Sequence, residues 1–227
     1  MKASPKRCRK SIHWHPVPFY IDVPPAMDRI DEHHAPRRSR KTMEFLMSFF
    51  DKIVAAVTPP ESDEKRMETR AHARSLARSG DWLSQVLDHH DRIESAFADV
   101  KGARDATAQR TAQKRLALIL TGHSNAEETV LYPALADNGE KAHAGLAYEE
   151  QAAAKVQMAL LERLEPLTDD YFEKLEHIRG AVTHHMYQEE SSWFLHLIEK
   201  VPESEQMMLS DRYREEIERY VREPAIA

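Results

Sequence analysis

The chain has 227 residues, 41% of them hydrophobic, a formal net charge of −6 and a single cysteine, Cys8. One cysteine excludes a disulfide-stapled domain, no apolar run approaches the roughly 20 residues of a transmembrane helix, and the N-terminus lacks a signal-like pattern, so we expect a cytoplasmic protein. The chain has only 6 glycines and is rich in good helix formers, which predicts an all-α fold.

The charge is unevenly distributed along the chain. Residues 1–42 hold 10 Lys and Arg but only 4 Asp and Glu, so the rest of the chain carries a net charge of −12. Because an acidic body binds nucleic acid poorly, we expect no nucleic-acid partner. Residues 1–38 contain six prolines and show no sustained period, which predicts an irregular basic arm. This arm is either inert or contacts an anionic surface.

Residues 39–80 are predicted to form a helical N-terminal extension. Apolar residues recur at helical spacing from Phe45 to Val57, and Pro59-Pro60 ends this stripe. We expect the stripe to pack on its own domain or on a second copy in a homo-oligomer, because a membrane-surface helix would usually carry more cationic flanks. Residues 61–78 are highly charged and predict a second helix or a linker.

Residues 81–201 are predicted to form an antiparallel up-down four-helix bundle. The first helix begins after Asp81, a good N-cap residue, and ends near Gly102. The other three helices are predicted from about Asp105 to Ala136, from Glu140 to Leu164 and from Asp169 to Lys200. Helices of this length with short connections pack as antiparallel neighbours, and cofactor sites then lie between facing helices. Residues 202–227 are predicted to add a C-terminal helix and tail.

Two His-x-x-x-Glu pairs lie within the apolar stripes of the second and fourth helices. His123 and Glu127 are four residues apart, as are His185 and Glu189, so each pair lies on one helix face. Because the stripes face the core, the pairs are expected to be buried. An unpaired carboxylate is costly there, and a metal ion is one of the few partners that removes the cost. The spacing therefore predicts a metal site inside the bundle.

His90 lies in the middle of the apolar stripe of the first helix. A lone inward histidine is more often a hydrogen-bonded core residue than a ligand, but two His-x-x-x-Glu helices beside it favour a ligand. Glu94, one turn later, is a candidate ligand, hydrogen-bond partner or solvated residue. His89 points about 100° away from His90, which predicts a position at the surface or behind the ligands. Tyr132 is a possible hydrogen-bond donor near the site.

These segments resemble the hemerythrin-like family, also called the HHE cation-binding domain. LDHHDRIESAF resembles the family's first segment, LTGHSNAEETVLYPAL its second and VTHHMYQEESSWFLHL its fourth, so the likeness covers about residues 81–200. The resemblance implies a bundle whose metal ligands are His90, His123, Glu127, His185 and Glu189. It also implies two non-haem iron ions joined by an oxo or hydroxo bridge, with O2, NO or peroxide as the small-molecule ligand.

The third helix departs from the family pattern. Gln151 takes the place of a histidine, and Lys155 stands one turn later, where some members carry another. An amide oxygen binds iron weakly, and an ammonium group opposes a cation. Tyr148 lies on the same helix face as Gln151, whereas Glu150 points about 100° away. We retain Tyr148, Glu150 and Gln151 as additional ligands or as neighbours of the ligands, and we expect Glu190 beside the ligands or at the surface.

The ligand types limit the metal and the function. Imidazole and carboxylate without thiolate suit iron, manganese or zinc, and the resemblance makes iron the first choice, with manganese or zinc behind it. We expect a protein that binds, senses or reacts with O2, NO or reactive oxygen species, or that handles iron. Fewer imidazoles would leave an open iron position, which favours reaction over reversible O2 carriage. The chain shows no nucleophile or substrate-pocket signature, so any turnover would be metal-based.

Two other functions stay open at this point. A regulatory or interaction module with a degenerate site, holding one metal or none, is motivated by the extra helices at both ends. A ferritin-like iron oxidase would ordinarily show Glu-x-x-His pairs on its helices. Here the histidine precedes the glutamate by four residues, which argues against that second alternative.

Overall fold

The computed structural model describes residues 61–221, and every element within that range is helical. The prediction of an all-α helical bundle is therefore confirmed. Within the same range, none of the helices combines the length and the apolar character that crossing a bilayer requires. The basic arm predicted over residues 1–38 and the apolar helix predicted from Phe45 to Val57 lie outside the described residues.

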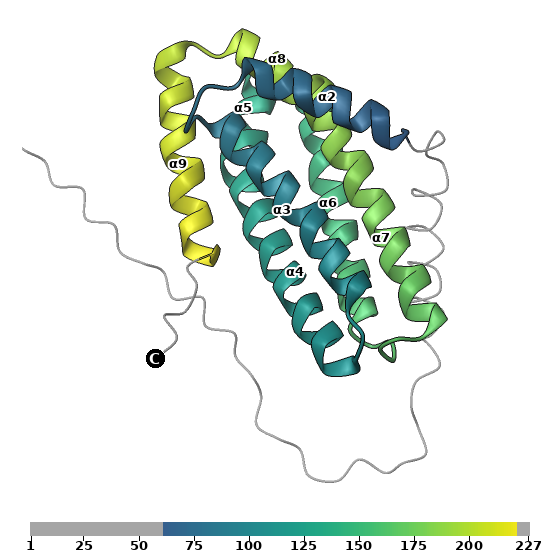
Figure 1. Cartoon of the computed structure of the whole chain (residues 1–227). Helices are drawn as coiled ribbons and strands as arrows, with labels where there is room; N and C mark the ends of the chain where they lie inside the picture. Colours follow the sequence, from purple (N-terminus) through teal and green to yellow (C-terminus); the bar gives the residue numbers. More distant parts are fainter. Residues whose placement is uncertain (1–60, 222–227) are drawn as a thin grey trace, which may run out of the picture. The chain divides into compact units, whose positions relative to one another are not determined.

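Four long helices form the bundle and run alternately up and down (Figure 1). They are α3 (Trp82–Gly102), α4 (Ala106–Ala126), α6 (Lys141–Leu161) and α7 (Asp169–Gln188). Side-chain caps fix three of their N-termini, because Asp81, Asp105 and Thr168 each accept a hydrogen bond from the backbone N–H three residues later. The cap predicted at Asp81 is among them.

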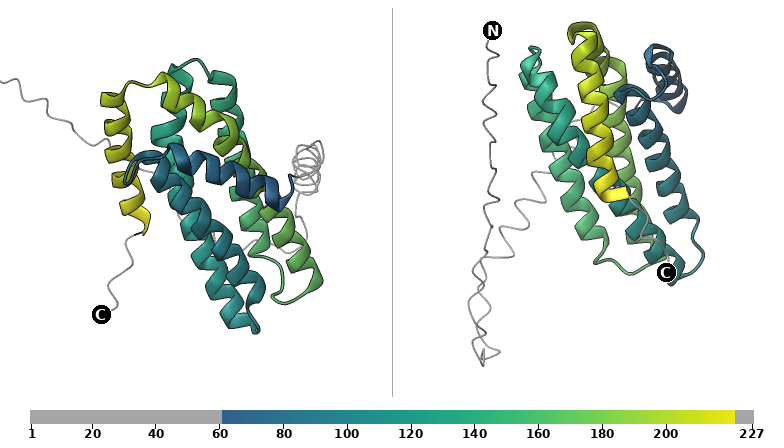
Figure 2. Two further views of the ribbon diagram at one scale, coloured as in Figure 1. Left: turned by 45° about the horizontal axis from the view of Figure 1, so that its top comes forward. Right: turned by 90° about the vertical axis from the view of Figure 1, so that its left-hand side faces the viewer.

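Two further helices pack on the outside of this bundle. α2 (Asp63–Leu76) lies across one end and contacts α3 and α7, whereas α9 (Glu203–Val221) runs beside α3 and α4 (Figure 2). Both helices add buried side chains to the interior of the bundle, such as Ala73 of α2 and Tyr213 of α9.

The second and fourth helices were expected to be continuous, and that expectation is wrong in one respect. Each contains a π-helical turn that begins at a glutamate of a His-x-x-x-Glu pair: η1 (Glu127–Leu131) precedes α5 (Tyr132–Asp137), and η2 (Glu189–Trp193) precedes α8 (Phe194–Lys200). The N–H groups of Tyr132 and Phe194 bond to the carbonyls five residues back. Such turns frequently mark functional sites. In η1, Pro133 supplies a local reason, because it has no N–H to continue the regular ladder.

The apolar core of the described chain is divided into two layers. On α3, Leu87 belongs to the layer near α2, α5 and α8, whereas Ile93 belongs to the layer at the opposite end of the bundle. The change from one layer to the other occurs at His90, which is fully buried. The same change separates Met186 from Trp193 on the fourth helix. Polar side chains therefore fill the middle of the bundle between two apolar layers.

Candidate metal centre

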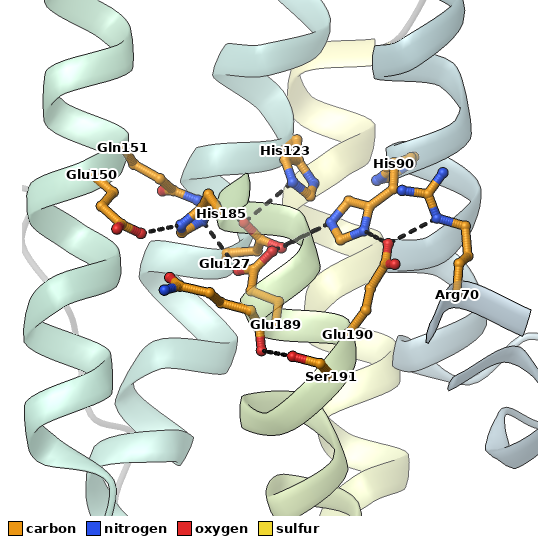
Figure 3. A network of polar contacts seen from close by, with 12 residues as sticks. Arg70, His90, His123, Glu127, Glu150, Gln151, His185, Glu189, Glu190 and Ser191 are labelled. Carbon is orange, nitrogen blue, oxygen red and sulfur yellow. Dashed lines mark hydrogen bonds and ion pairs between the residues drawn. The ribbon is translucent and has the colours of Figure 1, made fainter. Parts of the chain in front are cut away.

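Four predicted ligands from four different elements converge in this polar middle. One ligand atom each from His90, His123, Glu127 and Glu189 lies within 4.8 Å of the other three. The His90 Nε2 atom is 3.4 Å from Glu189 Oε2, and the His123 Nε2 atom is 3.3 Å from Glu127 Oε2. All four side chains are buried, and Figure 3 shows them pointing toward one another.

The facing atoms of these four residues have unsatisfied hydrogen-bonding capacity. His90 Nε2, His123 Nε2, Glu127 Oε1 and Glu189 Oε2 are buried without a hydrogen-bond partner. Each such atom costs the folded protein about 1–3 kcal/mol. Metal–ligand bonds of about 2.0–2.2 Å leave neighbouring donors about 3 Å apart, so only small adjustments would bring these atoms around one ion. The two nitrogen and two oxygen donors therefore fit a metal ion.

His185, the fifth predicted ligand, lies beside the other oxygen of Glu189 and beside Tyr132. Its Nε2 atom is 3.3 Å from Glu189 Oε1 and 3.0 Å from the Tyr132 hydroxyl. That hydroxyl is 2.8 Å from Glu189 Oε1 and 3.1 Å from Glu127 Oε2. Gln151 donates its amide N–H groups to Glu127 Oε2 and to the Tyr132 oxygen, both at 2.6 Å. One oxygen of each carboxylate is thus hydrogen-bonded and the other is unpartnered.

All three imidazoles have a polar partner behind them, at Nδ1. The partners are Glu190 for His90 at 2.6 Å, Tyr213 for His123 at 3.3 Å and Glu150 for His185 at 2.7 Å. An Nδ1–H that donates to such a partner leaves the Nε2 lone pair directed at the centre. These contacts therefore orient the imidazoles as metal ligands require. Glu150 was expected to point about 100° away from Gln151, and it contacts the site through its hydrogen bond with His185.

Two of the side chains behind the site come from the outer helices. Tyr213 on α9 is fully buried, and its hydroxyl lies 3.2 Å from His89 Nδ1 as well as beside His123. Arg70 on α2 donates from Nε to Glu190 Oε1 at 2.8 Å. Sequence reasoning missed both, because Tyr213 lies in an apolar stripe and Arg70 lies in a run of charges that is typical of solvated surface. No pattern in the sequence distinguished them.

The protonation equilibria reflect the crowding of charges in this dry interior. Burial, followed by the charge of Glu189, raises the pKa of Glu127 well above its ordinary value. Burial also opposes ionisation of Glu189, but the imidazoles of His185 and His90 more than offset it and lower its pKa. Burial and then the charge of His90 lower the pKa of His123. Because two adjacent buried carboxylates do not both ionise readily, a bound cation would compete with protons for these atoms.

Other sequence candidates lie outside the cluster. Glu94 is 40% exposed and bonds to Arg70, so its expected place one turn from His90 does not bring it to the centre. Tyr148 donates to the Glu128 carbonyl, although its ring meets the Tyr132 ring at 5.3 Å. The ammonium group of Lys155 pairs with the Glu128 carboxylate at 2.6 Å and so does not oppose a cation at the centre.

A small apolar cavity of about 70 Å³ lies beside the cluster, between α4, α6 and α7. Its apolar lining includes Leu120, Ala154, Ile178, Val182 and Met186. His123, His185 and Gln151 also line it. The cavity therefore gives a small neutral molecule a place next to the imidazoles.

The comparison with protein families agrees with the geometry. The family model described as the hemerythrin HHE cation binding domain matches residues 82–197, about half of the chain. This range runs from α3 into α8 and contains all five predicted ligands, whereas α2 and α9 lie outside it. No curated protein and no solved structure matches the chain.

Proposed function

The chain belongs to the hemerythrin HHE cation-binding family, and from this premise we propose that it is a non-haem iron protein that binds, senses or reacts with O2, NO or reactive oxygen species. The observation that carries the proposal is the convergence of His90, His123, Glu127 and Glu189 through buried atoms that lack hydrogen-bond partners. Handling of iron itself would use the same atoms.

The donor set limits the cation, and the resemblance to the hemerythrin family makes iron the first choice among the cations that fit. Imidazole nitrogen and carboxylate oxygen suit iron, manganese and zinc, whereas the cluster offers no thiolate for a softer metal. Bound iron would supply an open, redox-active Lewis-acid position for a small ligand. The protein contributes the rest: Glu190 and Tyr213 orient two imidazoles, and Tyr132 keeps its proton because burial raises its pKa well above the ordinary value.

We propose two unequal iron positions. The first is surrounded by His90, His123, Glu127 and Glu189. The second would use His185 and the remaining carboxylate oxygens, which now accept hydrogen bonds from Tyr132 and Gln151. A second ion must displace these bonds, so the first position is expected to fill at lower iron concentration. Gln151 contributes to this inequality, because it bonds to Glu127 Oε2 and offers no imidazole to the second position.

The apolar cavity supports a small neutral ligand. Its volume of about 70 Å³ exceeds the roughly 10–15 Å³ that a cavity needs to hold one water molecule. The aliphatic part of the lining favours a weakly polar diatomic molecule over an anion, because it offers no hydrogen bonds to a polar guest, and the imidazoles and Gln151 line the remaining part. The cavity thus fits O2 or NO better than it fits a charged metabolite.

The proposal is tested by reconstituting the full chain with Fe(II) without oxygen and then measuring the iron retained after gel filtration. The wild type is expected to retain about one tightly bound ion, and His123→Ala is expected to lose it. His72→Ala is the matched control, because this histidine is exposed on α2. A wild type that retains no iron, or a His123→Ala variant that retains as much as the wild type, refutes the proposal.

A second candidate is a regulatory module whose site stays empty. It is favoured by the hydrogen bonds that Gln151 and Tyr132 already make to the glutamates, which partly satisfy the site without a metal. Under this alternative, Fe(II) would leave the melting temperature unchanged. Under the iron proposal, iron at 100 times its Kd adds about 2.7 kcal/mol of stability.

A further inference from the structure

The outer helix α2 is held on the bundle mainly by arginines. Ala73 is its one residue that the structure buries fully. Arg74 pairs with Asp88 and Asp91 on α3, each at 2.8 Å. Since little apolar area anchors α2, its attachment depends on these charged contacts and on those of Arg70.

Arg70 makes the deepest of these contacts. Its Nε donates to Glu190 Oε1 at 2.8 Å, and the two terminal nitrogens donate to Asp91 at 2.9 Å and Glu94 at 3.1 Å. All three guanidinium nitrogens are therefore engaged, which fixes the orientation of this planar group. The Glu190 side chain is only 1% exposed, so Arg70 is a major source of positive charge for a carboxylate that water barely reaches.

The same Glu190 oxygen reaches a proposed iron ligand. Glu190 Oε1 accepts from His90 Nδ1 at 2.6 Å while it accepts from Arg70 Nε. His90 is fully buried, and its other nitrogen faces the four-residue cluster. Figure 3 shows the continuous path Arg70–Glu190–His90 from α2 to the centre. α2 lies outside the range that the family model matches, whereas Glu190 and His90 lie within it, so Arg70 is the one residue of this path that comes from outside the family domain.

We propose that Arg70 is a positioning residue for the metal centre, and that docking of α2 and binding of iron stabilise each other through Arg70–Glu190–His90. This inference rests on the proposed iron site. Arg70 holds Glu190, and Glu190 holds the His90 ring with its Nε2 atom toward the iron. Coupling between two binding equilibria is reciprocal. The factor by which docked α2 raises the iron affinity therefore equals the factor by which bound iron raises the docking equilibrium constant of α2. The docking of α2 on the outside of the bundle therefore depends on whether the buried site holds iron.

Two measurements on the full chain test the coupling. Hydrogen exchange of the α2 amides is compared with and without Fe(II) under nitrogen, and a chelator competition gives the iron affinity. In the wild type, Fe(II) is expected to slow exchange across Asp63–Leu76 by about tenfold, within the usual range of such couplings. In Arg70→Gln, the Fe(II) affinity is expected to fall about 10–100-fold, and exchange in α2 becomes fast and independent of Fe(II).

Arg74→Gln is the matched control. This variant removes an arginine from the same helix that pairs with Asp88 and Asp91 but does not contact Glu190. It is expected to speed α2 exchange overall while keeping the slowing by Fe(II), and to lower the iron affinity much less than Arg70→Gln does, because the path through Glu190 stays intact. Glu190→Gln interrupts the path in the middle with Arg70 in place, and it is expected to reproduce the loss of coupling. Circular dichroism checks that each variant keeps its helices.

The outcomes separate this inference from the proposed function. If the wild type binds no Fe(II), both fail. If the wild type binds Fe(II) but α2 exchange does not respond, or if Arg70→Gln and Glu190→Gln keep wild-type affinity and response, the coupling is overturned while the iron site stands. Should Arg70→Gln not fold, Glu190→Gln decides by the same two measurements.

Discussion

Replacing Glu127 by glutamine is expected to stabilise the metal-free protein and to abolish its response to iron. Glu127 is fully buried, and its Oε1 atom has no hydrogen-bond partner. The amide keeps the shape of the carboxylate, and its oxygen can still accept the bonds that Gln151 and Tyr132 donate to Oε2. Its NH2 group can donate where the carboxylate cannot. Satisfying that buried position is worth about 1–3 kcal/mol.

The pH dependence of stability sharpens this prediction. The pKa of Glu127 is raised in the folded protein, first by burial and then by Glu189. A carboxyl whose folded pKa lies above its unfolded value contributes stability that is greatest at low pH and is lost as the pH rises between the two values. The advantage of Glu127→Gln over the metal-free wild type should therefore grow as the pH rises from about 4 toward neutrality.

Thermal melts of the two proteins, with and without anaerobic Fe(II), measure both effects. For a chain of this size, each kcal/mol shifts the melting temperature by about 2–4 °C. Without metal the variant should melt higher than the wild type, and with Fe(II) only the wild type should gain. Glu128→Gln, which removes a carboxylate paired with Lys155, is the neighbouring control. It should change stability by less than about 1 kcal/mol and keep the iron response. A metal-free Glu127→Gln that melts below the wild type, or an iron-dependent gain equal to that of the wild type, would refute the reasoning.

Three further predictions concern the surroundings of the centre. Tyr213→Phe removes the hydroxyl behind His123 and should weaken Fe(II) binding about 10–100-fold in a chelator competition. Tyr171→Phe, the control, removes a buried hydroxyl bonded to Gln113 in the other layer and should leave the iron affinity unchanged. Equal iron affinities for the two variants would contradict the orienting role of Tyr213. Gln151→His should increase the tightly bound iron from about one to about two ions per chain in metal analysis, because it adds an imidazole to the second position; unchanged stoichiometry would show that Gln151 is not what limits it. Ala154→Leu partly fills the cavity and should slow NO binding in stopped-flow mixing without changing the iron affinity. An unchanged rate of NO binding would mean that NO does not enter the site through this cavity.

The sequence predicted the elements that carry the site because helical spacing is a local property. His123 and Glu127, and likewise His185 and Glu189, are one helical turn apart within apolar stripes, so their burial followed from periodicity alone. His90 required more, since a single inward histidine has several explanations. The family resemblance, now supported by the match to residues 82–197, favours a ligand, and the ligand role of His90 stays a prediction.

Contacts between distant helices could not be predicted in the same way. Tyr213 lies 90 residues from His123, and Arg70 lies 120 residues from Glu190. Periodicity places each side chain on a face of its own helix but does not say which helix that face meets. Glu94 illustrates the limit, because it shares a face with His90 yet is turned toward Arg70 at the edge of the bundle.

The π-helical turns also escaped sequence reasoning. A π turn inserts one extra residue into the ladder, which changes the direction of every following side chain by a fraction of a turn. Pro133 gives a reason for the turn at Glu127, but the corresponding position in the fourth helix is Leu195, which has a backbone N–H. Residue spacing alone therefore does not fix the directions of the side chains that follow each turn.

X-ray absorption of the iron-loaded full chain tests the central claim most directly, because it identifies the atoms bound to the metal. With one equivalent of Fe(II), the account predicts a shell of nitrogen and oxygen at about 2.0–2.2 Å, with imidazole scattering that falls in His90→Ala and in His123→Ala but not in His72→Ala. Iron surrounded by oxygen alone, or imidazole scattering that is unchanged when His90 or His123 is removed, would contradict it.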